Sequence, residues 1–510
     1  MQVIDLLIIV GYLVGITLFG TWFAKKQETT RDYFLGDRSV PWWAIAASIV
    51  ATETSTITFI SVPGIAYARG GNFQFLQLVF GYMLGRVVIS LIFIPLYFRG
   101  ELMTVYQLLE RRFGQRTKML AATLFVVMRN IADGIRLLLT AIVLAAVYTA
   151  FAPTTGADAV IVGSILVLGS VMIIFTYFGG MEAVIWIEVV QLGIYLLGAL
   201  AAALVLVGQI EGGLGAALAA GAAYGKFSLF DFSFDLTKTF TFWAGLLGGC
   251  FLTMSTHGTD QYLVQRYLCT DKPRRAAAAL LTSGAVVLAQ FIGFLFIGVL
   301  LFAFYHPYTD PAYELAATPA AYPFTGGDRV FPDFITKHMP SGLSGLVVAA
   351  ILAAALSSSL NSIAATAVND LYRPFRPNRD DRHYLRVSHW LTLLWGVVQV
   401  GVALAARNQD RSALDQALSV ASLINGPVLG VFLIGTFLRR AGESAALVGM
   451  FIGIAVMLYL NFMTPLAWTW YVLVGSMVTF LAAWLASFVF VPVTKSETAT
   501  VAKIDPETNR

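Results

Sequence analysis

The sequence predicts an all-α integral membrane protein with about thirteen transmembrane helices. Of its 510 residues, 58% are hydrophobic and only 12% are charged, and the mean hydropathy is +0.76. A soluble domain carries about 25% charged residues, so this composition is typical of a chain that lies mostly in lipid. Apolar runs of about 20 residues recur along the chain, which favours spanning helices and excludes an outer-membrane barrel with its short alternating strands.

Each candidate span has about the length that an α-helix needs to cross the hydrocarbon core of a bilayer. No connecting loop is long enough for a separate catalytic domain. The spans are expected at residues 3–23, 42–66, 75–98, 119–150, 159–178, 183–209, 240–262, 276–304, 343–369, 387–406, 415–438, 443–462 and 468–491.

The charged loops predict which side of the membrane each terminus faces. Basic residues gather in loops 24–41, 99–118, 263–275 and 372–386, and the predicted spans place all four loops on one side. Loops rich in lysine and arginine usually face the cytoplasm. We therefore expect a multi-pass cell-membrane protein with its N-terminus outside and the tail at 493–510 in the cytoplasm.

The first polar cluster lies inside a predicted span, in IVATETSTITFISVPG at residues 49–64. Glu53 stands among five hydroxyl residues within positions 52–58, with Pro63 and Gly64 following. A charge at bilayer depth persists only where it has a partner or lines a cavity. Proline, glycine and hydroxyl residues weaken a helix and free backbone carbonyls that can coordinate a cation. The stretch therefore predicts an unwound helix that holds substrate and a cation, with Glu53 as its charge.

Three other clusters place polar residues in apolar spans. Asp133 and Arg136 lie three residues apart on one helical face, so they form either an intrahelical ion pair or part of a substrate site. Glu188 has no basic residue at helical spacing within its span, which favours a functional role. The segment SSSLNS at 357–362 is polar within a small-residue helix, although hydroxyls in spans often only bond the preceding turn.

An enzymatic function has no residues to support it. The sequence holds no metal-ligand spacing, no nucleotide-binding loop and no nucleophile elbow, and His257 stands alone in its segment. We expect no organic cofactor and no nucleic-acid partner.

Five stretches resemble blocks of the sodium/solute symporter family, which contains sodium-coupled carriers of glucose, proline, iodide, pantothenate and sialic acid. They occur in the family's order, and the match covers most of residues 1–492. The stretches are TVYQLLERRFG (104–114), FGGMEAVIWIEVVQ (178–191), THGTDQYLVQRYLCTDKPRRAAAAL (256–280), LSSSLNSIAATAVNDLY (356–372) and GPVLGVFLIGTFLRRAGESAALVGMFIG (426–453).

The resemblance implies a LeuT-type fold, in which one extra N-terminal helix precedes two five-helix repeats of opposite membrane orientation. The first interrupted helix would be the 49–64 stretch, and the second would be WAGLLGGCFLTMSTHG, broken at Gly245, Gly248 and Gly249. The implied transporter domain is 1–492, divided into the extra helix and loop (1–41), repeat one (42–210), repeat two (239–440) and outer helices (441–492).

The resemblance also implies where sodium would bind. One site would use carbonyls of Ala51, Thr54 and Ile351, but Ala354 and Ala355 replace the two hydroxyl ligands that the family usually has there. A cation that lacks two oxygen ligands must recover them from water or a carboxylate. A second site, present in some members, would use Ser357, Ser358 and Glu188. Relatives usually have aspartate at the position of Glu188.

We expect a secondary active transporter that moves a small polar organic solute, such as a sugar, sialic acid or another carboxylate. The expected coupling ion is sodium, and the expected functional unit is a monomer. The alternatives are a proton-coupled or sodium-independent carrier of the same fold, because a buried glutamate can titrate near neutrality, and a transport-inactive, channel-like sensor. The expected substrate-binding residues are Glu53, Ser55, Thr58, Gln77, Arg136 and Asn361.

Overall fold

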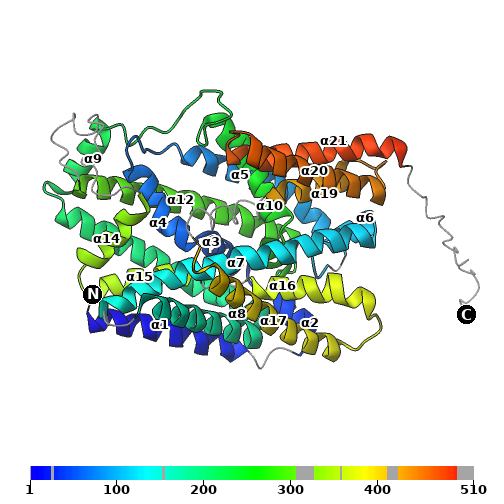
Figure 1. Cartoon of the computed structure of the whole chain (residues 1–510), viewed down its shortest axis with the longest axis horizontal. Helices are drawn as coiled ribbons and strands as arrows, with labels where there is room; N and C mark the ends of the chain where they lie inside the picture. The colour runs from blue at the N-terminus through cyan, green and yellow to red at the C-terminus, as the bar shows by residue number, and fades with distance from the viewer. Residues whose placement is uncertain are drawn as a thin grey trace, which may run out of the picture.

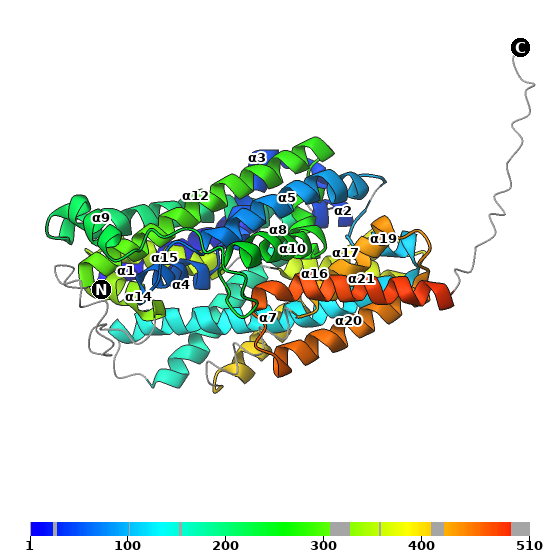
Figure 2. The same cartoon turned by 90° about the horizontal axis from the view of Figure 1, so that it is seen from above.

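A computed structural model describes residues 2–23, 28–100, 102–151, 156–305, 327–355, 359–409 and 423–490. Within these ranges the chain forms helices and connecting loops, without a strand. Long helices run along the longest axis of the molecule (Figure 1). Seen from above, α12 extends beside α5, against which it packs (Figure 2).

The helices follow the predicted spans closely. The first half of the chain contains α1 (Val3–Trp22), α2 (Thr30–Leu35), α3 (Trp42–Glu53), α4 (Thr56–Tyr67), α5 (Leu76–Tyr97), α6 (Gln107–Arg112), α7 (Gln115–Phe151), α8 (Ala157–Gln209) and α9 (Gly213–Ala223). The second half contains η3 (Ala244–Gly248), α10 (Gly249–Gly258), α11 (Gln261–Leu268), α12 (Pro273–Tyr305), α14 (Val330–Lys337), α15 (Leu343–Ala355), α16 (Leu360–Thr366), η6 (Ala367–Tyr372), α17 (Asp381–Ala406), α19 (Asn425–Phe437), α20 (Glu443–Met463) and α21 (Tyr471–Val489).

By length and composition, 8 helices of the described chain could each cross a membrane, or 9 if α3 and α4 count as one bent span. The predicted count of thirteen therefore stays a prediction. One reason for the difference is α8, whose range covers two predicted spans. Gly180 divides them with φ +60° and ψ −158°, a conformation that glycine adopts without steric cost.

The predicted interruption in the 49–64 stretch is confirmed. Helix α3 ends at Glu53, and the axis bends by 62° before α4 continues. Thr54 leaves helical geometry (φ −81°, ψ 87°), and the hydroxyl of Ser55 accepts a hydrogen bond from the Thr58 amide at 3.2 Å, which caps α4. The local sequence thus supplies the cap that a new helix requires.

The second interruption lies later than expected. Gly245 and Gly248 belong to the π-helical turn η3, which continues into α10, and the backbone departs from the helix at Thr259 (φ −132°). The Asp260 carboxylate then accepts a hydrogen bond from the Tyr262 amide at 2.8 Å and caps α11. The glycines instead allow close approach, since a Cβ on Gly245 would lie 2.6 Å from the Gln77 carbonyl carbon. The expectation that these glycines make the break is wrong.

Helix α1 packs on α8 and α15, along the edge of the molecule opposite α20 and α21 (Figure 1). Its buried Asp5 lies at the N-terminal end of α15. One oxygen of the carboxylate accepts hydrogen bonds from the amides of Gly342 (2.7 Å) and Gly345 (2.8 Å) and from the Ser344 hydroxyl (2.9 Å). Asp5 therefore satisfies donors that the first turn of a helix leaves unpaired.

Replacing Asp5 by alanine removes the acceptor for the partly buried Gly342 amide and the buried Gly345 amide. An unsatisfied buried donor costs about 1–3 kcal/mol, so Asp5→Ala should lower the Tm of the purified protein well below that of wild type. Asp5→Asn, which keeps one acceptor oxygen, should lower it less. Thermal unfolding in detergent measures both, and equal Tm values for wild type and Asp5→Ala would contradict this role.

Candidate functional site

A cavity of about 440 Å³ lies where the two interrupted helices face each other. Its size is within the range of about 300–1,000 Å³ that is usual for small-molecule sites. The α4 side contributes hydroxyls, and α5 and α12 contribute aromatic rings. The lining residues used below are Thr52, Glu53, Ser55, Thr58, Phe75, Arg129, Arg136, His257, Asp260, Tyr262 and Phe291.

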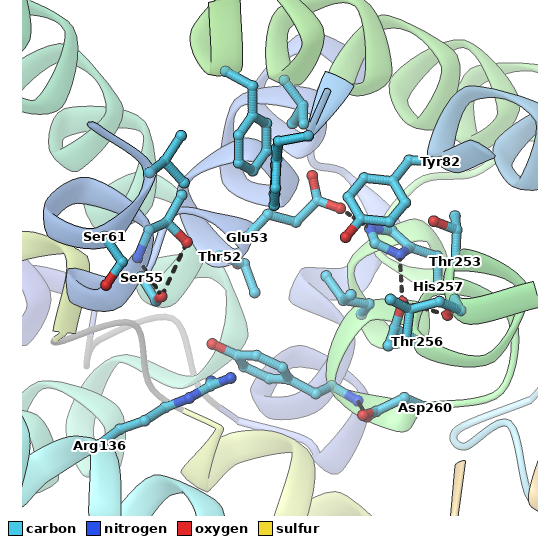
Figure 3. Close-up of a pocket in the computed structure, with 18 of the residues that line it drawn as sticks. Thr52, Glu53, Ser55, Ser61, Tyr82, Arg136, Thr253, Thr256, His257 and Asp260 are labelled. Carbon is cyan, nitrogen blue, oxygen red and sulfur yellow. Dashed lines mark hydrogen bonds and ion pairs between the residues drawn. The ribbon is translucent and has the colours of Figure 1, made fainter. Parts of the chain in front are cut away.

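Glu53, the last residue of α3, points at His257 of α10 across one wall of the cavity (Figure 3). Its Oε1 lies 2.5 Å from His257 Nε2. Arg86 of α5, which is fully buried, contacts both carboxylate oxygens through Nη2, with the bond to Oε2 measuring 2.6 Å. The charge of Glu53 is therefore compensated from behind the cavity wall, and its side chain is only 16% exposed.

The opposite side of the cavity carries a chain of charges on α7. Arg129 Nε lies 3.1 Å from Asp133 Oδ2, which also accepts a hydrogen bond from the Ser359 hydroxyl. Arg129 Nη1 lies 3.7 Å from Asp260 of the second interruption. Arg129 is thus held by two carboxylates and is 13% exposed.

Arg136 has fewer contacts with carboxylates than Arg129. Among the described residues its guanidinium meets only Asp133, at 3.5 Å, and its side chain is 41% exposed toward the cavity. Figure 3 shows Arg136 reaching in from the side opposite Glu53 and His257. Within the described chain, the hydrogen-bonding capacity of the Arg136 guanidinium is therefore largely unused, which is the property needed to bind a carboxylate.

Tyr262 of α11 connects this chain of charges to a second buried pair. The Arg129 guanidinium lies 3.8 Å from the centre of its ring, and that of Arg266 lies 4.5 Å away. Arg266 in turn forms an ion pair with Glu188 of α8, 2.5 Å from Nη2 to Oε1. Both side chains of this pair are within 1% of full burial.

The structure gathers four of the six predicted substrate residues, Glu53, Ser55, Thr58 and Arg136, around one cavity. Gln77 does not line the cavity. Its side-chain amide bonds the loop after α9: the oxygen accepts a hydrogen bond from the Asp231 amide at 3.0 Å, and the nitrogen donates to the Phe240 carbonyl at 3.1 Å. Asn361 also lies elsewhere. It donates to the Tyr33 carbonyl at 3.1 Å and accepts from Gln265 at 2.6 Å, which indicates a structural role.

The predicted sodium ligands lie partly within the described chain. Ala51 and Thr54 are buried at the C-terminal end of α3, where the Ser55 amide bonds the Glu53 carbonyl (3.1 Å) and not that of Ala51. Ile351 is buried on α15, which packs against α4 and α8. Ser357 and Ser358, and the side chains of Ala354 and Ala355, lie outside the described part. The roles of all these residues stay predictions.

Three residues of the site were missed by sequence reasoning. Arg86 is a charge within a predicted span, a signal that could have identified it. His257 stands alone in its segment of the sequence, yet in the structure it meets Glu53. Arg266 was assigned to a cytoplasmic loop, but α11 buries it completely.

Comparison with known proteins places the chain among sodium symporters. Residues 33–453 match a family model described as the sodium:solute symporter family. The chain is 30% identical over 503 residues to the sodium/sialic acid symporter SiaT of Proteus mirabilis, covering 96% of each protein. It is 28% identical to human sodium-coupled monocarboxylate transporter 1, over 90% of this chain and 73% of that protein.

Solved structures agree on the fold. A substrate-bound, outward-open Na⁺-coupled sialic acid symporter superposes with a TM-score of 0.83 at 29% identity, covering 96% of this chain and 98% of the other. The nucleobase-cation-symport-1 transporter Mhp1 superposes with a TM-score of 0.55 at 15% identity, over 90% and 95%. These likenesses confirm the predicted all-α, LeuT-type fold, and with the matched family they confirm a transporter and not an enzyme.

The pairing of Glu53 with Arg86 is testable by a double-mutant cycle. Arg86→Gln leaves a buried carboxylate without its main cationic partner, a change that typically costs about 3–5 kcal/mol. We expect a large loss of Tm and of transport in Arg86→Gln, and a Tm that recovers in the double variant Glu53→Gln with Arg86→Gln. Losses that simply add would show that the two side chains do not interact.

Proposed function

This chain belongs to the sodium:solute symporter family, and we propose that it is a sodium-coupled carrier of a small organic anion that works by alternating access. The observation that carries the choice of an anion is Arg136, a half-exposed guanidinium in a cavity whose other cations are already paired. The names of the relatives support the same class, since they include symporters of sialic acid and of monocarboxylates.

Substrate would bind between Arg136 and the hydroxyl face of α4. The carboxylate of the substrate would take the fork of Arg136, and Ser55 and Thr58 would accept and donate hydrogen bonds to its remaining polar groups. The apolar and aromatic part of the lining, such as Phe75 and Phe291, would cover the carbon skeleton. Such a division between a few polar groups and an apolar wall is usual in small-molecule sites.

Sodium would bind at the C-terminal end of α3. The carbonyl groups of a helix C-terminus carry partial negative charge, and in interrupted transmembrane helices they coordinate coupling cations. Ala51 and Thr54 lie there, and Ile351 would complete the set from α15. Glu53 supports sodium over protons as the coupling ion, because Arg86 already compensates its charge.

The orientation that fits this function has the N-terminus outside and the C-terminal tail in the cytoplasm, as the loop charges indicate. One chain contains the whole cavity, which supports a functional monomer.

Uptake into proteoliposomes tests the function. Radiolabelled sialic acid, a short monocarboxylate such as pyruvate, and glucose would each be offered with an inward sodium gradient, with potassium replacing sodium as control. We expect saturable uphill accumulation of an anion only with sodium. Accumulation that follows a proton gradient without sodium, or glucose as the only solute accumulated, would contradict the proposal.

Arg136 supplies a sharper test once the transported anion is known. Arg136→Lys keeps the charge but loses the bidentate fork, so KM should rise by about tenfold or more, the scale of one charge-assisted hydrogen bond. If Arg136 only forms an ion pair with Asp133, the double variant Asp133→Asn with Arg136→Gln should transport better than either single variant. Such recovery would contradict the substrate role.

Ala354 and Ala355 stand where the family usually has two hydroxyl ligands for sodium, so we expect weak sodium affinity. Restoring two hydroxyl ligands with Ala354→Ser and Ala355→Ser should lower the sodium concentration for half-maximal transport about tenfold, as expected for a gain of about 1–2 kcal/mol. Sodium titration of uptake measures the change. High sodium affinity in wild type that the two serines leave unchanged would disprove this view of the site.

A further inference from the structure

The connection between α9 and η3 holds three phenylalanine side chains away from the rest of the molecule. In its sequence, KFSLFDFSFDLTKTFTFW (226–243), Phe230, Phe232 and Phe234 alternate with polar residues. These three residues are 50%, 63% and 72% exposed. Leu236 and Trp243 of the same connection are also exposed. A cluster of exposed apolar side chains usually marks a surface that binds a partner.

The aromatic rings of the connection pack on one another. The rings of Phe230 and Phe232 stack with their centroids 5.5 Å apart, and the ring of Phe242 lies 5.0 Å from that of Phe232. Phe242 also contacts Trp243, which directly precedes η3, at 5.3 Å. The name aromatic patch is used below for Phe230, Phe232, Phe234, Phe242 and Trp243.

The aromatic patch continues an apolar stripe on α5. The ring of Phe230 stacks on that of Phe80, with centroids 6.3 Å apart. Leu84, Val87 and Leu91 follow Phe80 at helical spacing, so the four side chains share one face of α5. These three are exposed on a helix that is long and apolar enough to span a membrane, which is the surface that a span turns toward lipid.

Hydrogen bonds to two membrane spans hold the connection in place. The Gln77 side chain, at the beginning of α5, bonds the Asp231 amide at 3.0 Å and the Phe240 carbonyl at 3.1 Å. The Ala467 amide, just before the span Trp468–Val489, donates to the Leu236 carbonyl at 2.9 Å. The exposed rings therefore stand on a backbone that is fastened to both spans.

These contacts set the level of the aromatic patch along the membrane normal. The connection bonds the first turn of α5, leads into η3, and bonds the residue before the span Trp468–Val489. In both Figure 1 and Figure 2 it runs from α9 toward the beginning of α21. The loop charges predict that all three span ends face the outer side of the membrane. The patch is therefore expected at the outer membrane–water interface, where aromatic side chains are enriched.

Polar side chains of the connection satisfy its own backbone. The Asp231 carboxylate accepts a hydrogen bond from the Ser233 amide at 2.9 Å. The Asp235 carboxylate accepts from the Thr237 amide at 2.9 Å and from its hydroxyl at 2.7 Å. An amide that lies near lipid needs a partner within the protein, because water is scarce there. These bonds lower the free-energy cost of placing the connection against lipid.

We propose that the 226–243 connection is a membrane-docking surface, whose aromatic patch inserts among the phospholipids of the outer leaflet. Lipid is the occupant that fits, because the patch continues the lipid-facing stripe of α5 at the level of three span ends. Docking would hold the beginning of η3 at the bilayer surface, and η3 continues into α10, which carries His257 to the cavity. The inference does not depend on the proposed substrate or coupling ion.

A polarity-sensitive fluorophore on one introduced cysteine tests this docking in the full-length protein, held as one copy per phosphatidylcholine nanodisc. Phe232→Cys and Phe234→Cys place the label in the patch. Leu91→Cys is the lipid control, since Leu91 is 72% exposed, as Phe234 is. Lys337→Cys on α14 is the water control, because that charged side chain is 67% exposed. The native cysteines are buried, and labelled wild type gives the background signal.

We expect the label at both patch positions to emit at shorter wavelength than at Lys337→Cys. Phospholipids with brominated acyl chains should quench it at the patch and at Leu91→Cys, but not at Lys337→Cys. Both patch positions are exposed, so these variants should keep the wild-type Tm, which confirms that they are folded.

Two results would overturn the proposal. The first is a label at both patch positions that emits as in the water control and is not quenched, since the patch would then lie in water. The second is emission at short wavelength without quenching by brominated lipid, which would show that protein covers the patch. If that emission appears only with two copies per nanodisc, the occupant is a second copy of this chain.

Discussion

The interruption between α3 and α4 is the feature on which the rest of the site depends. Inside a bilayer, backbone groups that a helix end leaves open must find partners in the protein, in water or in an ion. Ser55 caps the start of α4, and we propose that backbone carbonyls at the end of α3 coordinate sodium. The break lies beside the cavity, so the proposed sodium site would adjoin the proposed solute site.

Ion pairs between helices lower the free-energy cost of the buried carboxylates near this break. Glu53 and Glu188 lie near the end of α3, and each is matched by a fully buried arginine from another helix, Arg86 or Arg266. Arg86 and Arg266 are neutralised by these carboxylates, so neither guanidinium is left to attract an anionic substrate. Arg136, with a long contact to Asp133 and a half-exposed side chain, is the guanidinium that we propose to bind the anion.

The sequence predicts the helices well because hydropathy is local, and it predicts the first interruption because Glu53 and its hydroxyl neighbours are adjacent in the chain. It fails where partners come from elsewhere. Arg86, His257 and Arg266 lie 33, 204 and 78 residues from the carboxylates they meet, so no helical spacing reveals them. Polarity alone also cannot separate Gln77, which fastens a loop, from Thr58, which lines the cavity.

The central proposal is that carbonyl groups at the end of α3 hold the coupling sodium. An experimental structure in sodium chloride, at a resolution that shows ions, tests it most directly. The account predicts an ion beside the carbonyls of Ala51 and Thr54. Sodium bound only elsewhere, with no ion beside these carbonyls, would contradict the account.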